Sequence, residues 1–148
     1  MKQLAMSFLL LTAMASFGAS RPQQRTAPDY KILLVVPKPD EGVPRSLEYF
    51  VSVPEFLDRS RIEALICKFI DQEKPQVGAI GLSIYQGLDR ITIGDLMVGV
   101  VPSGHDIAIY AWPSTKRGFL TVFRDPQGLR VQPLQRYEFD HEKACPKR

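Results

Sequence analysis

The chain of 148 residues has little of several features that would point directly to a function. Its two cysteines are too few for a disulfide-dense scaffold or for a zinc site built from four cysteines. Its formal charge is only +3, and its 19 basic residues are dispersed among 16 acidic ones, so we expect no nucleic-acid partner. The hydrophobic fraction of 45% and the charged fraction of 24% exclude long disorder, collagen and coiled coil.

Motifs of catalysis are also missing. The sequence has no Cys-x-x-Cys, no His-x-x-x-His, no Gly-x-Ser-x-Gly and no phosphate-binding glycine pattern. Of the two histidines, His105 follows a turn and His141 stands in a polar stretch that we expect to be solvated. The acidic residues form no evident pair, the candidates being Glu48, Glu55, Asp89 and Asp95. We therefore predict no catalytic residue, no metal and no cofactor.

The first 20 residues have the pattern of an export signal. Lys2 precedes a predominantly apolar run at residues 4–17, which is followed by small residues at 18–20. The run is shorter than the roughly 20 residues that a membrane span needs, and we expect no span in the mature chain. We predict a cleavable signal peptide at residues 1–20 and a location in the periplasm or outside the cell. An uncleaved N-terminal anchor is the alternative.

The remaining chain reads as one domain at residues 30–140, between a flexible leader at 21–29 and a polar tail at 141–148. Its clearest element is a helix at residues 61–73. Apolar residues recur there at helical spacing, namely Ile62, Leu65, Ile66, Phe69 and Ile70. Ser60 and Glu63 have the spacing of a capping box at the start of this helix.

Apolar runs bounded by proline and glycine predict strands in the rest of the domain. The predicted strands are residues 30–36, 46–53, 77–86, 106–112, 118–124 and 129–139, the last one bent near Pro133. Residues 91–101 are apolar but broken by two glycines, and they receive no assignment. The predicted fold class is α+β, with a mostly antiparallel sheet that ends in a C-terminal meander and packs against one amphipathic helix.

The best candidate for a binding surface lies on the hairpin near residue 112. A loop at residues 114–117 would pair Trp112 with Phe119 and Tyr110 with Thr121, which gathers aromatic side chains on one face of the sheet. Such a face could stack on a sugar or anchor a protein, unless another part of the chain covers it. The predicted binding residues are Tyr110, Trp112, Phe119, Lys116 and Arg117.

The two cysteines are candidates for one disulfide. An exported domain meets oxidising conditions, and a bond between Cys67 and Cys145 would tie the tail to the predicted helix. Two free thiols are the alternative. We expect a structural rather than a redox-catalytic role because no Cys-x-x-Cys is present.

Taken together, these features favour an exported, non-enzymatic binding or interaction module. Its expected partner is an envelope or extracellular protein or a glycan, and a subunit of an envelope assembly would differ only in that partner. The alternative is a small secreted hydrolase that uses carboxylate or histidine chemistry. A pocket with converging carboxylates or His105 would favour the hydrolase, whereas an exposed aromatic patch would favour binding.

Overall fold

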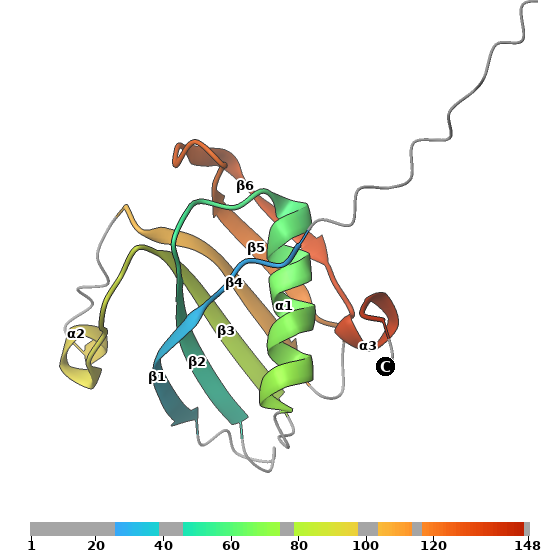
Figure 1. Ribbon diagram of the computed structural model, residues 1–148, viewed down its shortest axis with the longest axis horizontal. Helices are drawn as coiled ribbons and strands as arrows, with labels where there is room; N and C mark the ends of the chain where they lie inside the picture. Colours follow the sequence, from blue (N-terminus) through green and yellow to red (C-terminus); the bar gives the residue numbers. More distant parts are fainter. Residues whose placement is uncertain (1–25, 39–45, 75–78, 98–103, 114–116, 147–148) are drawn as a thin grey trace, which may run out of the picture.

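A computed structural model describes residues 26–38, 46–74, 79–97, 104–113 and 117–146. The predicted signal peptide at 1–20 lies outside these residues. The strands are β1 (Lys31–Lys38), β2 (Ser46–Val53), β3 (Ala79–Gln86), β4 (Asp106–Pro113), β5 (Phe119–Arg124) and β6 (Arg130–Glu138). The helices are α1 (Arg59–Glu73), α2 (Ile93–Met97) and α3 (His141–Ala144). Figure 1 shows α1 lying across one face of the sheet, which confirms the α+β class.

The six strands lie side by side in chain order, from β1 at one edge to β6 at the other. Every neighbouring pair is antiparallel except β2 and β3, which are parallel. Parallel neighbours cannot be joined by a tight turn, and here the chain crosses between them as α1. The last three strands, β4 to β6, form the predicted C-terminal meander, and β3 extends it by one antiparallel strand.

Helix α1 holds its place through one buried apolar stripe. Ile62, Leu65, Ile66 and Phe69 recur at helical spacing and are all fully buried. The helix ends at Lys74, whose backbone is left-handed with a φ of 43° and whose amide donates to the Ile70 carbonyl. The predicted stripe is therefore the side of α1 that faces the sheet.

The start of α1 differs from the predicted capping box. The carboxylate of Asp58 accepts a hydrogen bond of 2.9 Å from the Arg61 amide, so Asp58 is the N-cap. Glu63 instead forms an ion pair of 2.7 Å with Arg59. The predicted capping box between Ser60 and Glu63 was wrong. The carboxylate of Asp58, two residues before Ser60, accepts the hydrogen bond instead, so the helix begins at Arg59.

The sheet face toward α1, called here the inner face, carries the main core. Its buried residues alternate along the four central strands. They include Tyr49, Val51 and Val53 of β2, Ile80, Leu82 and Ile84 of β3, Ala108 and Tyr110 of β4, and Leu120 and Val122 of β5. The opposite face is called the outer face.

The register of the β4–β5 hairpin differs by one residue from the predicted one. Ala111 lies opposite Phe119, and Tyr110 lies opposite Leu120. Since side chains alternate between faces, this shift places Tyr110 on the inner face and Phe119 on the outer face. The physical reason is burial: the observed register places Tyr110 beside Leu120 and Val122 in the core, whereas the predicted one placed the smaller Ile109 on the face with Val122.

A second, smaller core lies on the outer face over one edge of the sheet. Phe50, Tyr85 and Ile91 are buried in it, and side chains that include Leu88 and Leu96 pack around them. Leu96 belongs to α2, within the segment that had received no assignment. This core covers β1 to β3 on the outer face, whereas none of its members comes from β4 to β6.

Candidate functional site

The five residues predicted to bind a partner do not lie on one face. Tyr110 is fully buried and Trp112 is half-buried against the inner core. Phe119 is on the outer face, and Arg117 is exposed, with an ion pair of 2.8 Å to Glu138. Lys116 lies outside the described residues. The register that grouped these side chains is wrong, and contact of any one of them with a partner stays a prediction.

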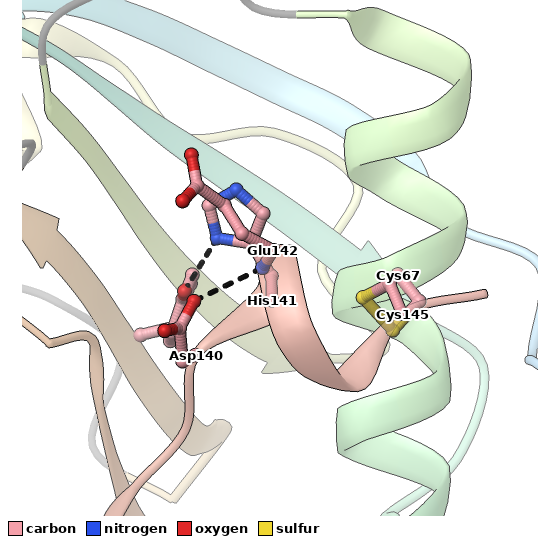
Figure 2. The surroundings of a disulfide bond; sticks show 6 residues. Cys67, Asp140, His141, Glu142 and Cys145 are labelled. Carbon is pink, nitrogen blue, oxygen red and sulfur yellow. Dashed lines mark hydrogen bonds between the residues drawn. A yellow bond between two sulfur atoms is a disulfide. The ribbon is translucent and has the colours of Figure 1, made fainter. Parts of the chain in front are cut away.

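The predicted disulfide is confirmed. Cys67 of α1 and Cys145, the residue after α3, are bonded, with their Cα atoms 5.3 Å apart and a sequence separation of 78. Figure 2 shows that the bond attaches the short turn of α3 to the side of α1. The disulfide therefore holds the end of the chain against the helix that covers the core.

Residues 141–145, called here the C-terminal clasp, differ from the solvated tail that we expected. His141 is buried, and its Nδ1 atom lies 2.8 Å from the hydroxyl oxygen of Tyr110 in a hydrogen bond. The ring of Trp112 meets the His141 ring edge-on, with centroids 4.6 Å apart. In Figure 2 the His141 ring lies on the side of the α3 turn away from the disulfide. The clasp thus has two attachments, one on each side.

Burial also keeps the two hydrogen-bonded side chains, His141 of the clasp and Tyr110 beneath it, in their neutral forms. Desolvation lowers the pKa of His141 below its ordinary value of 6.5, and the carboxylates of Glu142 and Asp140 offset this only in part. Desolvation likewise raises the pKa of the Tyr110 hydroxyl. At neutral pH the pair is therefore an uncharged imidazole and an uncharged phenol, which suits a packing contact better than proton transfer.

A patch of mostly apolar side chains lies on the outer face of the β4–β5 hairpin. Its members, called here the outer patch, are Ile109, Ala111, Phe119 and Thr121. Ile109 is opposite Thr121 and Ala111 is opposite Phe119. Ile109, at 39%, and Ala111 are exposed, and Phe119 and Thr121 are half-buried, but none of the four belongs to a buried cluster or packs against one. Here the outer face has no second layer among the described residues.

Strand β6 adds polar side chains along one side of the outer patch. Arg136 lies opposite Thr121, and its guanidinium carbon is 4.1 Å from the centre of the Phe119 ring. No carboxylate among the described residues pairs with Arg136. Glu138 lies opposite Phe119 and pairs with Arg117. The patch therefore has a mostly apolar centre and a charged edge, where Arg136 stacks on Phe119 and has no carboxylate partner among the described residues.

A shallow pocket of about 440 Å³ lies where the chain enters β1. Its lining consists of Asp29, Tyr30, Ile32, Lys68, Gln72 and Glu73. The ammonium of Lys68 contacts the carboxylate of Asp29 at 2.8 Å, and the Tyr30 hydroxyl donates to Glu73 at 2.8 Å. Burial and the Glu73 contact raise the pKa of Tyr30. The charged groups of this pocket and the Tyr30 hydroxyl are thus paired with one another.

The features required for the hydrolase alternative lie apart. His105 contacts the backbone carbonyl of Gln86 at 2.7 Å, whereas His141 contacts Tyr110. Glu55 pairs with Arg61, and Asp95 bonds to Thr92 at the start of α2. Within the described ranges, no group of three His, Cys, Asp or Glu side chains is close enough to hold a metal ion.

No protein-family model, curated protein or solved structure matches this chain. In the part of the chain that the structure describes, no helix has the length and apolar character needed to cross a membrane. The outer patch is the part of the sheet face opposite α1 that no cluster of buried side chains covers among the described residues.

Proposed function

We propose that the protein is a binding module whose outer patch contacts a second protein. The observation that carries the proposal is that Ile109 and Ala111 are exposed and Phe119 is half-buried on a sheet face whose other half has its own core. Contiguous apolar surface of this kind is typical of protein contact sites, in which an apolar centre is surrounded by polar groups.

The charged edge of the patch indicates the chemistry of the partner. Arg136 is exposed and lacks a carboxylate partner among the described residues, and Arg117 has an exposed, solvent-screened pair. We therefore infer a partner surface that is apolar at its centre and carries carboxylates at its edge. A glycan is less favoured, because Tyr110 and Trp112 lie on the inner face and the patch offers only the Phe119 ring.

The location in the periplasm or outside the cell forms part of the same proposal. The Cys67–Cys145 disulfide is compatible with an oxidising compartment, where such bonds persist. The apolar run at residues 4–17 supports export by its sequence pattern. An N-terminal sequence of the exported protein that began at residue 21 would support the predicted cleavage, and one that began at Met1 would contradict it.

The contact is tested with two substitutions matched for exposure. Ile109 in the outer patch is 39% exposed and Val35 on β1 is 40% exposed. The full-length protein, purified with its bound partner from the cells that make it, is compared with the variants Ile109→Asp and Val35→Asp. We expect a stoichiometric partner that Val35→Asp keeps and Ile109→Asp loses, and whose retention falls with Arg136→Glu. Retention by Ile109→Asp, or a dimer of this chain as the only complex, would contradict the proposal.

A further inference from the structure

The C-terminal clasp depends on few contacts for its position. Among residues 141–145 only His141 is buried, and Glu142, Lys143 and Ala144 are exposed. The helix α3 has four residues, which is too short to be stable by itself. The segment before it is fixed independently, since the Phe139 amide donates to the Gly118 carbonyl at 2.9 Å. The strand end at Phe139 is therefore held independently of the turn that Asp140 caps.

The disulfide is the one covalent attachment of this turn to α1. While the bond exists, Cys145 stays beside Cys67. The effective concentration of the His141 ring next to Tyr110 and Trp112 is therefore high. Without it, the turn is held by the hydrogen bond between His141 and Tyr110 and by the edge-on ring contacts of His141 with Trp112 and Tyr110. Release would return the imidazole to water and remove the desolvation that now lowers its pKa.

Both cysteines are half-buried rather than buried in the core, so the bond lies near the surface. We propose that the C-terminal clasp is a redox-controlled cover: reduction of the Cys67–Cys145 bond frees residues 141–145 and uncovers the edge of Trp112 and the hydroxyl of Tyr110. This device is separate from the outer patch, which lies on the opposite face of the same hairpin.

The reductant is a dithiol. One thiolate attacks a sulfur of the protein disulfide, forming a mixed disulfide and releasing the other cysteine as a thiolate. The second thiol of the reductant, as its thiolate, then attacks the reductant's own sulfur in the mixed disulfide, which closes the reductant's disulfide and releases the second protein cysteine as a thiolate. Two electrons and two protons pass to the protein, which ends with two thiols, while the reductant ends with one S–S bond.

The protein carries its own reporter because Trp112 is its only tryptophan. We compare acrylamide quenching of Trp112 in the full chain before and after treatment with dithiothreitol. We expect the quenching constant to rise at least about twofold on local opening, while the far-ultraviolet circular dichroism of the sheet is unchanged. The variant Cys145→Ser lacks the bond and is expected to show the high value with or without dithiothreitol.

Hydrogen exchange gives a second readout with an internal control. The Cys145 amide bonds to the His141 carbonyl within the clasp, whereas the Phe139 amide bonds to Gly118 outside it. Reduction is expected to accelerate exchange at Cys145 and leave Phe139 protected. Unchanged quenching and exchange in the reduced chain would overturn the proposal. So would loss of the sheet signal together with Phe139 protection, because the reduced chain would then unfold globally instead of opening locally at the clasp.

Discussion

The β4–β5 hairpin has two faces that are built from alternate residues of the same strands. On its inner face Tyr110 and Leu120 are fully buried beneath α1, whereas on its outer face Ile109 is 39% exposed. The two faces have similar apolar character, so hydrophobicity alone does not distinguish the core from the exposed patch. The position of α1 and the one-residue register make this distinction, and they leave the outer patch available to a partner.

The largest expected difference between the faces is in stability. Phe69 is fully buried and contacts the rings of Tyr30 and Tyr49. We expect Phe69→Ala to lower the free energy of unfolding by about 3–5 kcal/mol, because it leaves a cavity in the inner core. Ile109→Ala on the outer face is expected to cost less than about 1 kcal/mol. Urea unfolding followed by circular dichroism measures both, and similar losses would show that the outer face is also core.

Removing the disulfide tests how much the bond between α1 and the C-terminal clasp adds to the free energy of unfolding. We expect the double variant Cys67→Ser, Cys145→Ser to lose about 2–4 kcal/mol, because a loop of 78 residues is no longer closed in the unfolded chain. The comparison is made by urea unfolding of this variant and the oxidised wild type. A loss as small as that of Ile109→Ala would show that the bond adds little to the free energy of unfolding.

Gly118 tests the close packing where β5 begins beneath the inner core. A Cβ atom at this position would lie 2.4 Å from the Phe139 carbonyl oxygen and 2.6 Å from the Tyr110 hydroxyl. We expect Gly118→Ala to cost about 1–3 kcal/mol through this steric conflict. Gly94 in α2 has ordinary space, so Gly94→Ala is the matched control and is expected to be neutral or slightly stabilising. Thermal or urea unfolding of the two variants distinguishes these outcomes.

The smallest expected effect is the pH dependence that arises from His141. Its pKa is lowered in the folded state, so the unfolded chain binds the proton more readily as the pH falls through about 6.5. Stability is therefore full above that value and decreases below it, by about 1 kcal/mol for each unit of pKa difference. We expect the His141→Gln variant to lose this part of the pH dependence of the unfolding free energy, measured by urea unfolding between pH 7.5 and pH 5. The same pH dependence in the variant and the wild type would assign the effect to other groups.

Much of the fold could be predicted because each element carries its own local signal. The stripe of α1 follows helical spacing, and the strands are bounded by proline and glycine. The helix α2 also had a signal, since Thr92 and Asp95 have capping-box spacing and do bond to each other, but the two glycines nearby obscured it. The parallel pairing of β2 and β3 depends on contacts between distant segments and has no such local signal.

The outer patch could not be located from the sequence because its face depends on register. Tyr110 and Ile109 are adjacent, and a shift of one residue decides which of them meets α1. The burial of His141 was missed for a similar reason. Its neighbours Asp140, Glu142 and Lys143 are polar, and only the disulfide and the fit against Tyr110 bring its ring to the core.

The most direct measurement is site-specific photo-crosslinking in the cells that produce the protein. A photoreactive phenylalanine analogue replaces Phe119 in the outer patch and, as the matched control, Val35 on β1. If the outer patch contacts a second protein, we expect one discrete adduct with that protein from position 119, none from position 35, and loss of the adduct when Arg136→Glu is added. The proposed contact is contradicted if position 119 gives no adduct, gives only an adduct with a second copy of this chain, or gives the same adduct as position 35.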